Sequence, residues 1–196
     1  MVPSISIGST LTIHMVLHVL LMNVAAPLVA LLALRMMIKS FRLRGRWLAL
    51  ATSVQIALLW GWHAPSMLER VLSETSLHVF MQMSLFAAAS VFWFLVFSQR
   101  GADLWRAILA LLVTSKLYCL LGVLLMFAPV SLYSAVDLHH SHGLGTLGDQ
   151  QMAGLLMLLA CPPTYVLLGI ILAAQWVRAL AKRDHVGWVP ATKSNS

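Results

Sequence analysis

The sequence predicts an all-α membrane protein, a polytopic bundle of about five transmembrane helices. Of its 196 residues, 60% are hydrophobic and 10% are charged, whereas about a quarter of the residues in soluble domains are charged. The mean hydropathy is +0.87, and long apolar stretches alternate with short polar segments. In this setting a net charge of +7 is a signal of membrane topology and does not indicate a nucleic-acid partner.

The first predicted span covers residues 11–34. The segment before it contains no Lys or Arg, and the apolar run is longer than that of a signal peptide, so we expect an uncleaved span with a kink at Pro27. Residues 35–46 then bring five basic side chains and no acidic one. The positive-inside rule places this loop in the cytoplasm and the N-terminus in the periplasm.

Four further spans follow, over residues 47–62, 76–97, 104–127 and 149–177. The second span ends in an aromatic anchor before the connection 66–75, and residues 99–106 form a tight inner turn. The last span is expected to kink at Pro162-Pro163. This arrangement puts eleven of the thirteen Lys and Arg residues inside. Residues 1–185 are therefore predicted to form one transmembrane domain, and residues 186–196 a polar cytoplasmic tail.

Histidines gather at the outer face of this predicted bundle. His14 and His18 are one helical turn apart, and Met22 continues the same stripe. Seven of the eight histidines, all except His185, fall at or near the outer side. Because the topology was assigned from Lys and Arg alone, this clustering is a separate observation, and it points to a metal site.

Neutral imidazole and thioether groups hold Cu(I) without placing extra negative charge in a low-dielectric layer, and one carboxylate neutralises the ion. Met81 follows His78 as Met22 follows His18. Zinc also accepts histidines and a carboxylate, but the methionines favour copper. The predicted ligands are His14, His18, His63, His78, Asp149, Met22 and Met152.

Four motifs occur in order along the chain. They are HMVLH at 14–18, WGWHAP at 60–65, His78 at the start of a span, and DQQMAGLLM at 149–157. In this order they resemble the CtaG-type cytochrome c oxidase assembly factors of bacteria, as a short member, from about residue 10 to residue 177.

The resemblance implies a multi-pass protein of the bacterial inner membrane that helps copper reach cytochrome c oxidase. Its partners would be oxidase subunits, a periplasmic copper donor and the lipid bilayer. The family positions carried over are His14, His18, His63, His78 and Asp149 with Gln150.

Other functions stay open from the sequence. A metal-free scaffold for oxidase assembly, a haem-binding membrane cytochrome with histidines from two spans, and a homo-oligomer are alternatives. An enzyme has the least support, because the sequence has no HExxH motif and few outer carboxylates.

For several other side chains the sequence leaves the role open. Lys116 lies mid-span, where it either pairs with a carboxylate of a partner or snorkels to the membrane surface. Cys119 and Cys161 are expected to pack in the core. The cluster of His139, His140 and His142 is either a metal-capture arm or a solvated loop, and we favour the loop.

Overall fold

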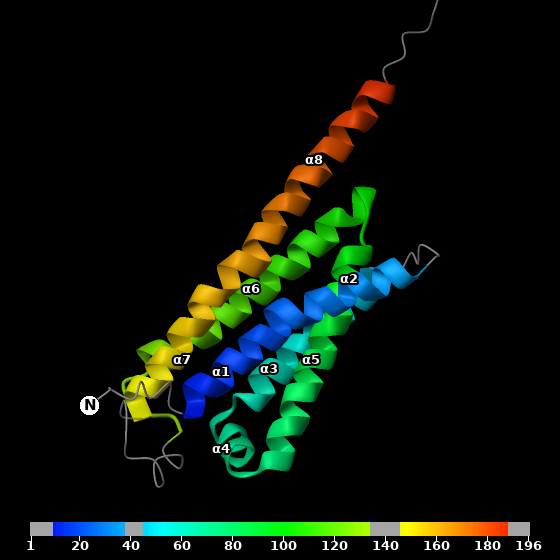
Figure 1. Ribbon diagram of the computed structural model, residues 1–196. Coiled ribbons are helices and arrows are strands. Elements are labelled where there is room, and N and C mark those ends of the chain that lie inside the picture. The colour runs from blue at the N-terminus through cyan, green and yellow to red at the C-terminus, as the bar shows by residue number, and fades with distance from the viewer. Residues whose placement is uncertain (1–9, 38–44, 134–145, 188–196) are drawn as a thin grey trace, which may run out of the picture.

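The computed structural model describes residues 10–37, 45–133 and 146–187, and these ranges contain helices and turns but no strand. The helices form five rods that run side by side (Figure 1). The rods are α1 (Thr10–Leu20) with α2 (Ala26–Met36), α3 (Gly45–Trp62), α5 (Thr75–Ser98), α6 (Leu104–Phe127), and α7 (Thr146–Cys161) with α8 (Leu167–Gly187). The all-α prediction is confirmed.

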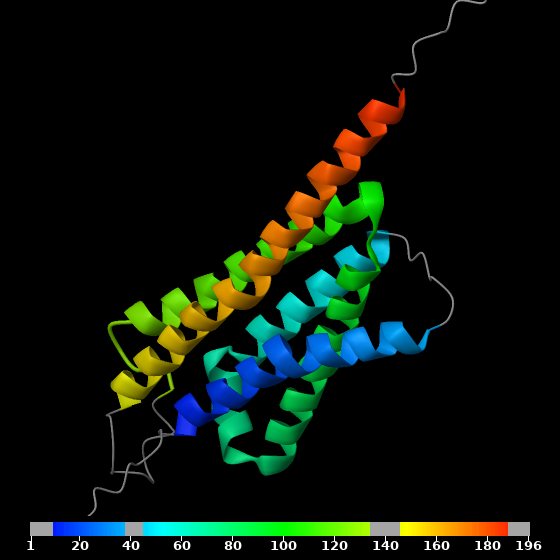
Figure 2. The ribbon, with the colours of Figure 1, turned by 45° about the horizontal axis from the view of Figure 1, so that its top comes forward.

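The five rods pack in a closed ring. α1 packs on α7, α2 on α5, α3 on both α5 and α6, and α6 on α7 and α8. Successive rods run in opposite directions, so the starts of α1, α5 and α7 and the end of α3 lie together (Figures 1 and 2). We call this the histidine end, because His14, His18, His63 and His78 lie there.

Four helical stretches are long and apolar enough to cross a membrane: Leu11–Met36, Thr75–Ser98, Gly101–Phe127 and Leu147–Ala181. α3 is not among them, because polar residues such as Arg46 and Gln55 lower its hydropathy. The described helices thus indicate a membrane protein. The count of five spans and the orientation of the termini stay predictions.

Two of the rods contain π-helical turns at their prolines. In the first rod the turn is Leu21–Ala25, and the amide of Ala26 bonds to the carbonyl of Leu21, five residues back. In the last rod it is Pro162–Val166. Proline has no N–H and its ring crowds the preceding turn. At these points the backbone hydrogen bonds therefore change from the α-helical spacing of four residues to the π-helical spacing of five. Both irregularities lie where the sequence predicts kinks.

Of two connections between the rods, one is the turn that the sequence predicts and the other contains a helix that was not expected. Residues 99–106 form the expected tight turn, with Gly101 at a φ of 57° in the left-handed region that glycine favours. Residues 66–75 were expected only as a connection, but they fold mostly into the short helix α4 (Pro65–Ser73). Pro65 starts this helix, and Leu68 and Val71, one turn apart, bury its apolar face.

A polar contact network joins four rods at the centre of the bundle. The amide nitrogen of Gln55 donates to the hydroxyl of Tyr118 at 2.8 Å, and that hydroxyl donates to the sulfur of Met22 at 3.6 Å. The indole of Trp93 donates to the carbonyl of Met22 at 2.9 Å. Met22, 1% exposed, is therefore held from α3, α5 and α6.

Candidate metal centre

Four imidazole rings from three parts of the chain meet at the histidine end. His14 and His18 come from α1, His63 follows α3, and His78 lies in the first turn of α5. The ring centroids of His14 lie 6.2 Å from those of His18, 6.3 Å from His63 and 5.0 Å from His78. The His18 and His63 centroids are 5.5 Å apart. The predicted clustering of these four residues is thus present in the fold.

One ring nitrogen of His63 is available to bind a metal ion. Its Nδ1 lies 2.7 Å from the carbonyl oxygen of Leu59, which only accepts, so Nδ1 carries the proton. Burial lowers the pKa of His63, which keeps the ring neutral. Nε2 is buried without a hydrogen-bond partner among the described residues. A histidine that donates one N–H to a backbone carbonyl and leaves the other nitrogen free has the arrangement of a metal ligand.

His14 has a similar arrangement through a second histidine. Its Nδ1 lies 2.9 Å from Nε2 of His78, and the amide nitrogen of Gln82 lies 3.4 Å from the same atom. Because the amide nitrogen only donates, Nε2 of His78 is an acceptor and Nδ1 of His14 donates to it. Nε2 of His14 is then left buried with a free lone pair.

His18 is the least satisfied of the four histidines. It is 2% exposed, and neither ring nitrogen has a hydrogen bond of regular geometry among the described residues, although the side chain of Gln82 interacts with the ring. A buried polar group without a partner costs about 1–3 kcal/mol. Four buried ring nitrogens at the histidine end make no regular hydrogen bond among the described residues: two on His18 and one each on His14 and His63. A bound ligand would remove part of this cost.

The rings do not form a closed ligand shell as they stand. Within the described residues, no group of three or more His, Cys, Asp or Glu side chains is placed to hold one ion. The hydrogen bond between His14 and His78 joins two ring nitrogens to each other instead.

Asp149, a predicted ligand, contacts the start of α1. Its carboxylate accepts hydrogen bonds from the backbone amides of Leu11 and Thr12, both at 3.0 Å, and from the hydroxyl of Thr12. These amides have no partner within their own helix, and the carboxylate also favours the positive end of the helix dipole. In this structure Asp149 caps the helix that carries His14 and His18.

The side chain of Gln150 holds the segment after α6 through hydrogen bonds to its backbone. Its side chain accepts from the amide of Leu132 at 2.8 Å and donates to the carbonyl of Leu125 at 3.1 Å. In the same segment the hydroxyl of Tyr133 donates to the carbonyl of His63 at 3.0 Å. Burial raises the pKa of Tyr133 to about 12, so this hydroxyl stays protonated. Gln150 and Tyr133 therefore support the backbone at His63.

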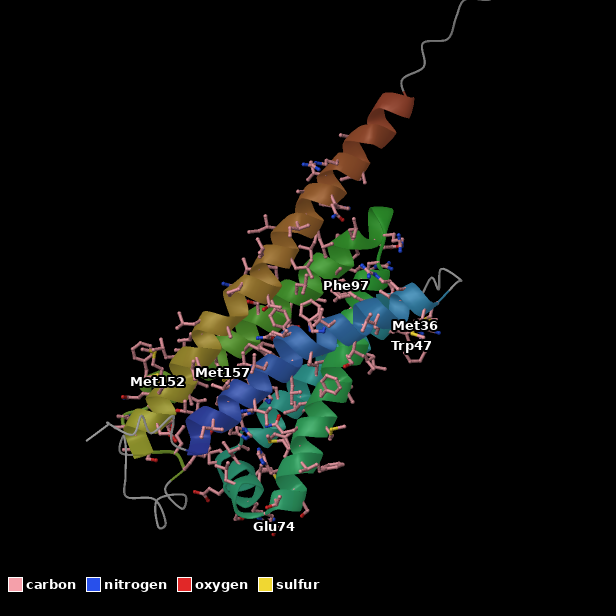
Figure 3. All side chains as sticks on the ribbon, viewed as in Figure 1. Met36, Trp47, Glu74, Phe97, Met152 and Met157 are labelled. Carbon is pink, nitrogen blue, oxygen red and sulfur yellow. The ribbon has the colours of Figure 1, made fainter. Side chains whose placement is uncertain are left out.

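The two predicted methionines lie in different surroundings. Met22 is buried in the first rod, one turn below His18. Met152 is 40% exposed on α7, whereas Met157 on the same helix is 3% exposed (Figure 3). Met157 was not among the predicted ligands. The small residues Ala153 and Gly154 mark the packed face of α7 that Met157 shares, and they were the available signal.

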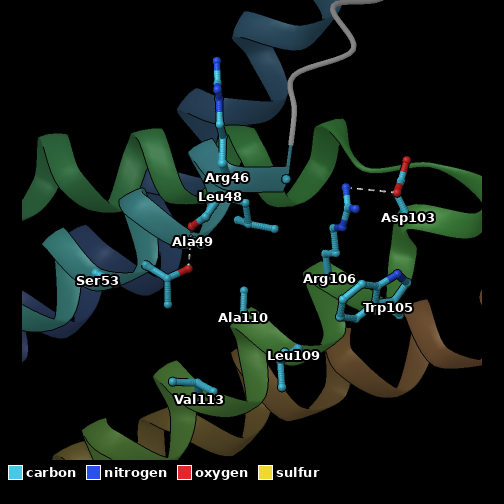
Figure 4. Close-up of a pocket in the computed structure, with 12 residues that line it drawn as sticks. Arg46, Leu48, Ala49, Ser53, Asp103, Trp105, Arg106, Leu109, Ala110 and Val113 are labelled. Atoms are coloured by element: carbon cyan, nitrogen blue, oxygen red, sulfur yellow. Dashed lines mark hydrogen bonds and ion pairs between the residues drawn. The ribbon is translucent and has the colours of Figure 1, made fainter.

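The remaining candidates lie away from these rings or outside the described residues. Lys116 is exposed on α6, and Cys119 packs against the core as expected. His139, His140 and His142 lie outside the described residues. A cavity of about 830 Å³ between α3 and α6 contains none of the histidines and adjoins the ion pair of Arg106 and Asp103, 3.1 Å apart (Figure 4).

One protein-family model matches most of the chain. The model of the cytochrome c oxidase caa3 assembly factor family (Caa3_CtaG) matches residues 7–179. That range includes every described helix from α1 to α7 and most of α8. No curated protein and no solved structure matches the chain. Since the match covers most of the 196 residues, the chain belongs to the Caa3_CtaG family of cytochrome c oxidase assembly factors.

Proposed function

We propose that this family member binds copper at the histidine end and delivers it to cytochrome c oxidase during assembly. The family supports the role in oxidase assembly. The observation that carries the copper step is the group of buried, unpartnered nitrogens on His14, His18 and His63. Ionisable side chains in an apolar layer are rare, and three such rings together are by default a candidate functional site.

Ring spacing supports an ion at this position. Metal–nitrogen bonds of about 2.0–2.1 Å in a tetrahedral site place imidazole centroids about 5–6 Å apart. Among His14, His18 and His63 the observed separations are 5.5, 6.2 and 6.3 Å, so two of the three pairs are slightly wider than this range. Small shifts of the rings would be needed to aim Nε2 of His14, His18 and His63 at one ion. Nδ1 of His14 can keep its hydrogen bond to Nε2 of His78, which orients the His14 ring.

The chemistry of the donors favours Cu(I). Imidazoles bind several metals, but a monovalent ion among neutral ligands leaves the least uncompensated charge in an apolar layer. The proposed mechanism is ligand exchange: a periplasmic donor loads the site, and an oxidase subunit removes the ion. Asp149 contributes by holding α1 in register with α7, so that His14 and His18 face His63.

The test is elemental analysis of the detergent-purified protein after anaerobic loading with Cu(I). We expect near-stoichiometric copper in the wild type and a large loss in the His14→Ala/His18→Ala double variant, together with lower oxidase maturation in cells. His185→Ala is the matched control, because the sequence predicts this histidine on the other side of the membrane.

The outcomes separate the proposal from its alternatives. Full copper and full oxidase activity in the double variant would show that the site assignment is wrong. No copper in either protein would favour the metal-free scaffold. A haem protein would show itself by visible absorbance of the purified wild type.

A further inference from the structure

A small, partly open cavity adjoins His18 at the lower edge of the histidine cluster. Its volume is about 10 Å³, which is close to the smallest space that holds one water molecule. It lies between the first rod, α6 and α7, and it is lined by His18, Val19, Met22, Asn23, Tyr118 and Met157.

The lining combines one imidazole with two thioethers and contains no charged side chain. His18, Met22 and Met157 are 2%, 1% and 3% exposed. Neither ring nitrogen of His18 has a hydrogen bond of regular geometry among the described residues, and the ring interacts only weakly with the side chain of Gln82. Thioether sulfur is a soft donor that selects Cu(I) over harder ions such as zinc. A neutral donor set also suits a monovalent ion in a buried place.

We propose that His18, Met22 and Met157 form a second, sulfur-containing Cu(I) site one helical turn below the four-histidine cluster. This inference rests on the proposed copper function, since it names a deeper station for the same ion. His18 adjoins both places: its ring lies 5.5 Å from that of His63, and it also lines the cavity. An ion held by the histidines can therefore pass to sulfur without leaving His18.

The fold fixes Met22 beside this cavity. Met22 lies in the π-helical turn Leu21–Ala25, and such turns are frequent at functional sites. Trp93 holds its carbonyl at 2.9 Å, and the hydroxyl of Tyr118 donates to its sulfur at 3.6 Å. A thioether sulfur has a second lone pair, which stays available to an ion. Tyr118 is thus a positioning residue for Met22.

Copper X-ray absorption on the anaerobically loaded, detergent-purified full chain tests this site. We expect sulfur as well as nitrogen neighbours around copper in the wild type. In Met22→Leu/Met157→Leu the sulfur signal should disappear, nitrogen ligation should remain, and Cu(I) affinity should fall by about tenfold or more. Leucine nearly conserves the volume of methionine, so packing is largely kept. Met83→Leu, at an exposed position of α5, should behave as the wild type.

The outcomes distinguish this site from the copper function itself. Copper bound by nitrogen alone in the wild type would overturn the sulfur site and leave the histidine cluster in place. A sulfur signal that survives in the double variant would also overturn it. Failure of the wild type to bind any copper would overturn the proposed function first. The wild-type spectrum decides the question even if the double variant does not fold.

Discussion

At the scale of single residues, Asp149 links two distant parts of the chain to the histidine cluster. It accepts from the amide of Leu11, 138 residues away in sequence. Asparagine and aspartate are about equally good helix caps, whereas alanine in a capping position costs about 0.5–2 kcal/mol. We therefore expect Asp149→Ala to lower the thermal unfolding midpoint and the bound copper. Both carboxylate oxygens accept hydrogen bonds here, whereas asparagine keeps one accepting oxygen, so Asp149→Asn should fall between Asp149→Ala and the wild type in both readouts.

This pair of variants separates a capping role from a ligand role for Asp149. If the carboxylate binds copper directly, Asp149→Asn removes the charge and should lose copper as fully as Asp149→Ala does. Differential scanning in detergent and copper analysis of the same samples give the two readouts. Asp103→Asn, which changes only an exposed ion pair with Arg106, is the control for loss of a carboxylate.

At the scale of elements, the contact of α6 with α7 depends on two glycines. A Cβ added at Gly154 would lie 2.7 Å from the carbonyl oxygen of Gly122 and 2.8 Å from the amide nitrogen of Met126. Both contacts are with backbone atoms, which cannot move away by a change of rotamer as a side chain can. Gly154→Ala should therefore destabilise the protein by about 1–3 kcal/mol. It should also disturb α7, which carries Asp149 and Met157.

Gly169→Ala is the matched control for Gly154→Ala. A Cβ at Gly169 on α8 meets no atom within 4 Å, and alanine is the better helix former by about 1 kcal/mol. Thermal unfolding of both variants should show a lower midpoint for Gly154→Ala and an unchanged or higher one for Gly169→Ala. Equal effects would mean that the close approach of α6 and α7 does not limit stability.

The elements also show which features the sequence predicts. The apolar runs locate the first four rods within a few residues, since hydropathy depends on composition alone, whereas the last rod continues to Gly187, ten residues beyond the predicted end at 177. Spacing on one helix predicts that His14 and His18 share a face. It does not predict which helix packs next to which, and the cap from Asp149 depends on the contact of α1 with α7. The choice between Met152 and Met157 depends on how α7 is rotated in the bundle, which small residues only hint at.

At the scale of the whole molecule, the direction of the proposed copper transfer depends on which side of the membrane the histidine end faces. The positive-inside rule puts it in the periplasm. In the described ranges, Arg35, Arg46, Arg100 and Arg106 lie at or near the other ends of the rods. α3, with 18 residues, reaches about 27 Å and barely spans a hydrocarbon core of about 30 Å. Whether α3 crosses the membrane therefore decides the topology.

Single cysteines at three exposed positions test this arrangement in a background without Cys119 and Cys161. Met37 follows α2, Ser66 lies in α4, and Ala102 lies between α5 and α6. A membrane-impermeant maleimide should label Ser66→Cys in intact cells, and Met37→Cys and Ala102→Cys only after the inner membrane is opened. Labelling of Met37→Cys and Ser66→Cys from the same side would show that α3 does not cross. If Ser66→Cys were labelled only in opened cells and the other two were labelled in intact cells, the histidines would face the cytoplasm. Copper would then have to be loaded from that side.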